Sequence, residues 1–277
     1  MRVLAVHAHP DDEAIWTGGL LAHYAREGAE VLVVTCTLGE EGEVIGKPYS
    51  QLTVDHADQL GGFRIAELYS SLNILGAIGH HLGGAGHFRD SGMAGTPAAA
   101  NPRAFVNNTN EAIELLTEVI DDFEPHLVVT YGPDGGYGHP DHIQAHHITH
   151  KAVEAASVKV DAILWAVTSR AALDNSLSEV QEYPDGWRWA PEEIAAVDEF
   201  DLALDLSEHV YEAKVEAMKT HATQVWIADG EGTMVNPTPA VGIAPDTVWA
   251  LSNLITQTVV RKEYYQIGYG SWNFGKE

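Results

Sequence analysis

Two histidine-proline-aspartate clusters, about 130 positions apart, constrain this chain more than any other feature. The first is His9-Pro10-Asp11-Asp12-Glu13 and the second is His139-Pro140-Asp141-His142. A short apolar segment precedes each cluster, which is typical of a buried strand that ends there. If both strands belong to one parallel sheet, the clusters lie at the same sheet edge, where α/β proteins bind ligands. Imidazoles and carboxylates brought together in this way predict a catalytic metal site.

The order of elements is that of an α/β protein, because strands alternate with helices of crossover length. Buried strands are expected at 2–6, 31–35, 126–130 and 161–167. Helices are expected at 13–26, 54–75, 112–123, 140–155 and 208–220, and Gly61-Gly62 interrupts the second of them. We predict an open, mainly parallel sheet with helices on both faces. Residues 1–170 would form this core and residues 171–277 a smaller C-terminal subdomain beside the substrate cleft, unless the two are one continuous domain.

Composition narrows the range of partners and compartments. The chain has 40 acidic and 15 basic residues, a formal charge of −25, which repels nucleic acid and anionic membranes. The single cysteine, Cys36, excludes an internal disulfide and a thiolate-rich zinc site. No apolar stretch has the length of a membrane span or of a signal peptide. We therefore expect a cytoplasmic protein. The charge favours a neutral or cationic small-molecule ligand, but it is explained better as a solubility feature with no bearing on the substrate.

The two clusters leave several assignments open. Asp11 and Asp12 are consecutive and should point in different directions, so one could bind a metal while its neighbour meets the attacking water. Alternatively, either carboxylate could simply cap the following helix. His139 and His142 lie three positions apart across a helix start, so one could ligate while the other faces the substrate. Asp141 could orient one of the imidazoles.

Other segments give weaker signals. The loop 37–43 offers carboxylates, 83–93 combines glycines with polar residues suited to a substrate rim, and Arg64 could clamp a hydroxyl or a carboxylate. His146, His147 and His150 lack the glutamate of a His-Glu-x-x-His site, so we expect them on the helix surface or behind the ligands. A glycine-rich nucleotide turn and a G-x-S-x-G serine elbow are both absent from the sequence.

Taken together, these motifs resemble the LmbE/PIG-L-like family of metal-dependent N-acetylglucosaminyl deacetylases. Within that family the chain is most similar to the branch that acts on N-acetylglucosaminyl-inositol in the mycothiol pathway. The similar segments are 6–13, 35–46, 52–67, 82–96, 135–142 and 214–225. The C-terminal third matches loosely.

The resemblance implies a Rossmann-like core and a bound divalent metal, normally zinc, with ferrous iron as an alternative in the cell. The metal ligands match His9, Asp12 and His142, and the general base that activates the water matches Asp11.

The same resemblance assigns the remaining site positions. His139 matches the general acid, Tyr137 a mobile residue that stabilises the oxyanion, and Asp141 the partner that tunes His139. The positions that match substrate-binding residues are Arg64, Asp90, Glu43 and Met93.

The activity implied by the resemblance is hydrolysis of the acetamide of N-acetylglucosaminyl-inositol, which yields acetate and glucosaminyl-inositol. One alternative is a mycothiol S-conjugate amidase, which has the same metal chemistry and a larger substrate. Another is a non-catalytic metal-binding protein, although such a protein would need neither Asp11 nor His139. The oligomeric state is left open.

Overall fold

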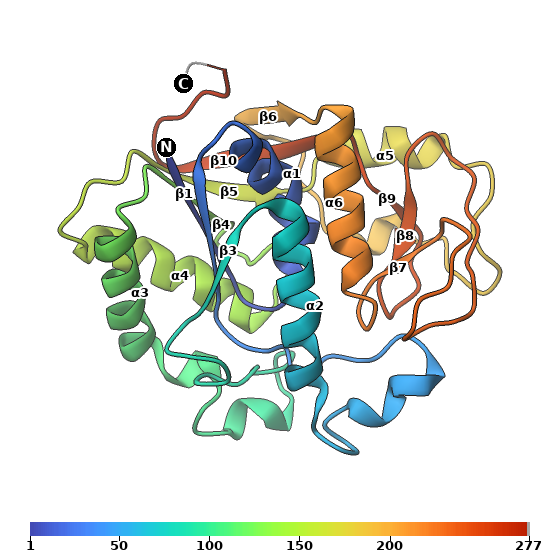
Figure 1. Ribbon diagram of the computed structural model, residues 1–277, viewed down its shortest axis with the longest axis horizontal. Helices are drawn as coiled ribbons and strands as arrows, with labels where there is room; N and C mark the ends of the chain where they lie inside the picture. Colours follow the sequence, from blue (N-terminus) through green and yellow to red (C-terminus); the bar gives the residue numbers. More distant parts are fainter. Residues whose placement is uncertain (276–277) are drawn as a thin grey trace.

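A seven-stranded sheet forms the centre of the molecule in the computed structural model, which describes residues 1–275 (Figure 1). The strand order is β3-β2-β1-β4-β5-β10-β6. The strands that pair in parallel are β1 (Arg2–His7), β2 (Glu30–Thr35), β3 (Ile78–His81), β4 (Leu127–Tyr131) and β5 (Ala162–Val167). At the other end, β10 (Lys262–Gly270) lies antiparallel between β5 and β6 (Leu202–Asp205). The expected α/β sheet, mainly parallel, is confirmed.

Both faces of the central strands are buried, which explains their continuous apolar sequence. In β1, Val3 and Ala5 pack into one core cluster, while Leu4 and Val6 pack into the other. The first cluster includes residues of α1 (Asp12–Arg26), α2 (Leu60–Leu75) and α6 (Glu208–Thr220). The second includes residues of α3 (Thr109–Phe123) and α4 (Pro140–Ala155). Helices therefore cover both faces, as expected.

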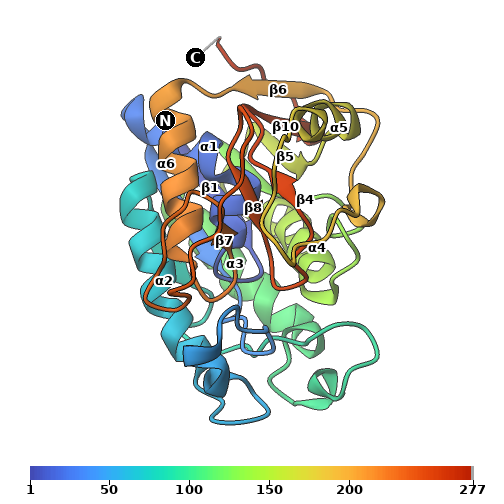
Figure 2. The same cartoon turned by 90° about the vertical axis from the view of Figure 1, so that its right-hand side faces the viewer.

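The chain after residue 170 contributes to two sheets. It supplies β6 and β10 to the main sheet and forms a small antiparallel sheet, seen beside α5 and α6 in Figure 2. The elements of this part not yet given are α5 (Arg170–Ser178), β7 (Trp226–Ile227), β8 (Val248–Ala250) and β9 (Gln257–Thr258). A domain boundary at residue 170 stays a prediction.

Short 3₁₀ helices occur in the loops at Lys47–Leu52, Pro97–Ala100, Phe105–Asn107 and Pro191–Glu193. Across residues 1–275, no helix combines the length and the apolarity that a bilayer crossing requires.

Some elements differ from the expectation. The helix expected from residue 54 begins at Leu60, because the preceding segment forms turns and Asp58 has a φ of +51°. The strand β3, only four residues long, was not expected, since its Gly-His-His sequence lies at the sheet edge and is not apolar. The helix α5, the strand β6 and the nine-residue strand β10 were not among the expected elements either.

A buried carboxylate ties α1 to β10. Glu263 accepts hydrogen bonds from the backbone amides of Gly19 and Leu20, each at 2.7 Å. The same carboxylate pairs with Lys214 of α6 at 2.5 Å and accepts the hydroxyl of Tyr265 at 2.6 Å. Backbone and carboxylate approach this closely because residue 19 has no side chain.

Replacing Gly19 with alanine should therefore destabilise the fold. Its Cβ would lie 2.5 Å from Leu206 Cδ2 and 2.9 Å from the Glu263 carboxyl group. We expect a loss of about 1–3 kcal/mol in the free energy of unfolding, measured by urea denaturation. Gly18→Ala is the matched control in the same helix, since the nearest atom to its Cβ would be Lys214 Cγ at the longer distance of 3.2 Å. Equal stability of the two variants would contradict this packing argument.

Candidate metal centre and active site

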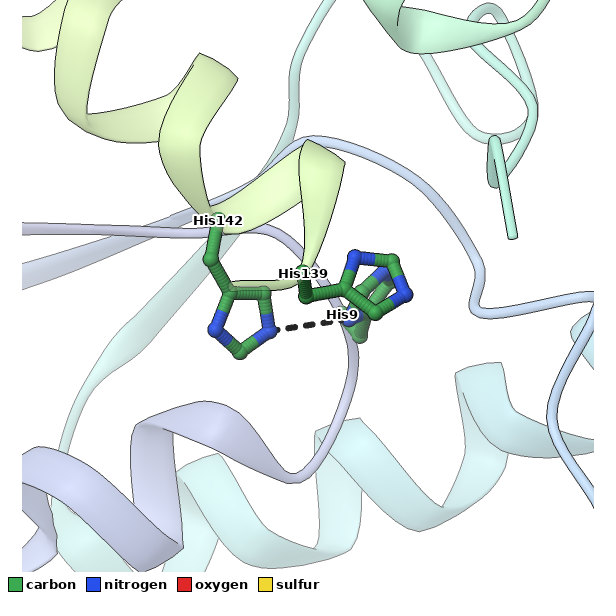
Figure 3. Close-up of side chains that lie close together, drawn as sticks. All are labelled: His9, His139 and His142. Carbon is green, nitrogen blue, oxygen red and sulfur yellow. Dashed lines mark hydrogen bonds between the residues drawn. The ribbon is translucent and has the colours of Figure 1, made fainter. Parts of the chain in front are cut away.

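The loops that follow β1 and β4 meet at the carboxyl edge of the sheet. The two strands are paired in parallel, so their following loops leave the sheet side by side. The first loop carries His9, and the second leads through a glycine-rich turn to His142 near the start of α4. His9 Nδ1 and His142 Nε2 lie 3.3 Å apart. Figure 3 marks this contact with a dashed line. The predicted convergence of the two clusters is therefore present.

Asp12 completes a triangle of ligand atoms with these two histidines. Its Oδ2 lies 3.5 Å from His9 Nδ1 and 3.4 Å from His142 Nε2. Around a tetrahedral zinc ion with bonds of about 2.0–2.1 Å, ligand atoms stand about 3.3–3.4 Å apart. The three atoms thus have the spacing of one face of such a tetrahedron, and the donor set fits a divalent cation.

The other nitrogen of each imidazole is occupied by an acceptor. His142 Nδ1 lies 3.1 Å from the carbonyl oxygen of Gly135. His9 Nε2 lies 3.3 Å from Asp141 Oδ2 and 3.6 Å from Asp90 Oδ1. A ring nitrogen that donates to such acceptors leaves the lone pair on its partner nitrogen. The nitrogen that keeps its lone pair is Nδ1 in His9 and Nε2 in His142, and these are the two ring atoms of the triangle. Such an arrangement is typical of metal-binding histidines.

Negative charge is in excess around the triangle. The carboxylates of Asp12, Asp90 and Asp141 are all buried, and burial alone would raise the pKa of each of the first two. Instead, His142 and His9 hold the pKa of Asp12 well below its usual range. The carboxylates in turn raise the pKa of His9 against the effect of burial. A divalent cation would offset this clustered charge.

His139 is a looser candidate ligand. His9, His139 and His142 each offer a ring nitrogen, and these atoms lie within 4.8 Å of one another. His139 Nδ1, however, accepts the backbone amide of Asp141 at 3.2 Å. Burial, His9 and His142 lower the pKa of His139 to about 3, so its ring is neutral near pH 7. Its proton then resides on Nε2, which can donate a hydrogen bond.

The carboxylate of Asp141 contacts His9, whereas its backbone amide is what reaches His139. It also accepts the backbone amide of Ser91 at 2.9 Å. The orienting effect expected of Asp141 on an imidazole is therefore directed at His9. A tuning effect on His139 stays a prediction.

Asp11 is the first residue before α1, but its side chain makes no capping hydrogen bond. Its carboxylate pairs with Arg64 at 3.1 Å and lines a cleft that runs over the triangle. Burial raises the pKa of Asp11 to about 6, although the Arg64 guanidinium opposes the shift. A carboxylate with such a pKa suits proton transfer near neutral pH.

The cleft has a volume of about 480 Å³. Nine of the eleven residues predicted for the site line it, whereas Asp141 and His142 are fully buried beneath it. The nine are His9, Asp11, Asp12, Glu43, Arg64, Asp90, Met93, Tyr137 and His139. Tyr137 and Met93 are about half exposed, so they lie at the rim.

Arg64 is largely engaged by the protein itself. It donates to the backbone carbonyls of Pro10 and Gly39 as well as pairing with Asp11. Its contribution to substrate binding stays a prediction, but the structure gives it a clear part in holding the Asp11 turn.

Tyr131 is a site residue that the sequence reasoning missed. Its hydroxyl donates to Asp12 Oδ2 at 2.6 Å and accepts the Ala8 amide at 2.9 Å. Its ring stacks on His142 with a centroid separation of 4.1 Å. The available signal was its position, since it directly precedes the glycine-rich loop and ends an apolar strand.

The segment 221–224 was also missed as part of the site. Gln224 lines the cleft and donates to the backbone carbonyl of Glu43 at 2.7 Å. Thr223 donates to both oxygens of Glu67, with its amide at 2.8 Å and its hydroxyl at 2.7 Å. The segment therefore braces the loop that carries Glu43 against α2.

An α/β fold with a buried centre of two histidines and one carboxylate at the carboxyl edge of its sheet is typical of metal-dependent enzymes. The chain belongs to the GlcNAc-PI de-N-acetylase family, PIG-L, whose model matches residues 4–153. All three atoms of the triangle belong to that matched region.

Relatives with similar sequences span nearly the whole chain. A protein of Corynebacterium glutamicum (strain R) is 55% identical over 98% of this chain and 92% of its own length. One of Corynebacterium efficiens is 57% identical over 98% of this chain and 89% of its own length. Both carry the name 1D-myo-inositol 2-acetamido-2-deoxy-alpha-D-glucopyranoside deacetylase.

Solved structures share the fold at lower identity. A deacetylase in complex with teicoplanin has a TM-score of 0.56 at 18% identity, over 97% of this chain and 99% of its own. GalB, the 4-carboxy-2-hydroxymuconate hydratase from Pseudomonas putida KT2440, also has a TM-score of 0.56, at 16% identity over 100% and 99% of the chains. Because a hydratase shares it, the fold alone does not determine the reaction.

The geometry predicts which residues hold the metal. Loss of a residue that only hydrogen-bonds to a metal ligand typically lowers metal affinity by about 10–100-fold. Asp12→Ala removes a ligand itself, so it should lower zinc affinity by more than this. His139→Ala should bind zinc nearly as tightly as the unchanged protein, because His139 is outside the close triangle. Isothermal titration of the metal-free proteins with zinc measures both. A larger loss of affinity in His139→Ala than in Asp12→Ala would favour the three-histidine set.

Proposed function

We propose that this protein is a zinc-dependent deacetylase that hydrolyses the acetamide of N-acetylglucosaminyl-inositol to acetate and glucosaminyl-inositol. The observation that carries the proposal is the ligand triangle of His9, Asp12 and His142, with Asp11 beside it in the same cleft. The names of relatives at 55–57% identity support this substrate. The reaction would be a step of mycothiol biosynthesis.

A divalent cation held by the triangle would act as a Lewis acid toward the acetamide carbonyl and would lower the pKa of a water molecule. Asp11 would take the proton of the attacking water, because its carboxylate lines the cleft and its pKa is raised toward neutrality. Arg64 holds this carboxylate in place through the 3.1 Å ion pair.

His139 would protonate the departing nitrogen. The donating form is the imidazolium, which would give its Nε2 proton to the nitrogen and return to the neutral ring that its low pKa favours. The proton that Asp11 takes from the water would replace the one given up. Tyr137, at the rim of the cleft, would donate a hydrogen bond from its hydroxyl to the oxyanion that forms from the acetyl carbonyl oxygen. The phenol is protonated near pH 7, and partial desolvation together with the nearby Asp12 carboxylate raises the pKa of Tyr137 further.

The sugar and inositol hydroxyls would be bound by polar groups that line the cleft. Asp90 and Glu43 offer carboxylates, and Met93 offers an apolar contact for a sugar face. Zinc is the proposed metal because one carboxylate and two imidazoles suit it, although ferrous iron has similar preferences. The cytoplasm is the proposed compartment, and the buried free thiol of Cys36 is compatible with its reducing conditions.

Release of acetate tests the proposed reaction. The metal-loaded protein should release acetate from N-acetylglucosaminyl-inositol, and a chelator should abolish this activity, which added zinc then restores. The bimane conjugate of mycothiol, which presents a larger amide, should be turned over more slowly. Faster turnover of the conjugate would instead favour the amidase function, and stoichiometric zinc without hydrolysis of either compound would favour a non-catalytic metal-binding protein.

Asp11→Asn should separate catalysis from metal binding. Asparagine keeps the shape of the side chain and tolerates positive φ, but it cannot accept a proton. We expect kcat to fall by about 10²–10⁴-fold, the usual contribution of a general base, while the zinc content stays at that of the unchanged protein. Rapid-quench assays and elemental analysis measure the two quantities. A near-normal kcat would remove Asp11 from the mechanism.

A further inference from the structure

A fully buried ion pair lies behind the metal-binding turn. Glu13 Oε1, in the first turn of α1, is 2.6 Å from His221 Nε2, which directly follows α6. Both side chains have no exposed surface. Neither lines the cleft formed by the described residues, so the proposed mechanism leaves this pair without a role.

The carboxylate of Glu13 joins three parts of the fold. Its Oε1 also accepts the hydroxyl of Ser71 of α2 at 2.5 Å. Its Oε2 accepts the backbone amide of Asp11 at 3.0 Å. One side chain therefore connects α2 and the end of α6 to the amide of the proposed general base.

Asp11 needs such support because its backbone is strained. Its φ of +113° and ψ of −31° lie outside the conformations that residues with a Cβ ordinarily adopt. Conformations of this kind cost about 1–3 kcal/mol and persist only where surrounding contacts impose them. Glu13 binds the amide of Asp11, while Arg64 binds its carboxylate and the carbonyl of Pro10. The turn is thus held on both sides.

Stability alone is a poor explanation for the buried pair. Two ionisable groups removed from water contribute little net stability compared with apolar side chains of similar volume. His221 Nδ1 has no hydrogen-bond partner among the described residues, so the polar contact of this ring is made to Glu13. The contact fixes one oxygen of Glu13 and leaves the other directed at the Asp11 amide.

We propose that His221 is a positioning residue for Asp11 and acts through Glu13. By holding the Glu13 carboxylate, His221 keeps Asp11 in its strained conformation with the carboxylate in the cleft. The inference rests on the proposed function, because it gives Asp11 the part of general base. It assigns the C-terminal part of the chain a contribution to the geometry of the reaction as well as to the cleft wall.

His221→Ala should lower kcat by about 10–100-fold, the usual effect of residues that orient a site from behind. KM and zinc content should stay close to those of the unchanged protein, because the triangle and the cleft wall are not touched. His221→Gln should recover part of the lost kcat, since its amide can donate to Glu13. His150→Ala is a matched control, because it removes the acceptor of the Trp165 indole at 2.9 Å, away from Asp11. Its kcat should not change.

A crystal structure of zinc-loaded His221→Ala gives a readout independent of activity. We expect the φ of Asp11 to move to a negative value and its carboxylate to leave Arg64.

If this variant does not fold, Ser71→Ala removes another donor to Glu13 and should lower kcat several-fold without loss of zinc. An unchanged kcat in the folded variant, or an unchanged Asp11 φ, would overturn the inference. Absence of acetate release by the unchanged protein would contradict the proposed function, while the Asp11 conformation would still decide whether His221 positions it.

Discussion

The ligand atoms of His9, Asp12 and His142 come from two distant segments and lie within 3.5 Å of one another below the protein surface. The parallel pairing of β1 with β4 makes this possible. Because these strands are neighbours at the centre of the sheet, the loops after them emerge together. The second loop must also fold tightly against its own helix. Gly135 has a φ of +68°, and a Cβ there would lie 2.8 Å from His142 Cβ. Only glycine lets its carbonyl approach the ring and hold it.

The buried negative charge around the ligand triangle is a second constraint on the structure. A chain with 40 acidic and 15 basic residues buries several carboxylates at one sheet edge. Arg64 neutralises Asp11, and the imidazoles of His9 and His142 share Asp12. Asp141 Oδ1 still has no partner among the described residues. Such a cluster is costly to bury without a compensating cation, so folding of the apo protein should be coupled to metal binding.

The sequence allowed the parallel core and the two clusters to be predicted because both are local signals. Apolar runs identify buried strands, and each cluster follows one directly. Tyr131 and His221 were missed for another reason, since each acts on a residue more than a hundred positions away. The strand β10 was underestimated because it mixes buried and partly exposed positions, unlike the wholly buried β4. Its partners β5 and β6 lie far from it in the chain.

Two stretches of the sequence build the cleft, and only the first of them holds the ligand triangle. The family model matches residues 4–153, which contain the ligand triangle, Asp11 and His139. Beyond that region, Leu173, Trp249 and Tyr264 are among the residues that line the same cleft. A hydratase shares the fold, so the reaction must depend on the loops at the sheet edge and not on the sheet. By the same reasoning, discrimination between an acetamide and a bulkier amide should depend on the wall residues from both stretches, and those beyond residue 153 can vary without disturbing the ligand triangle.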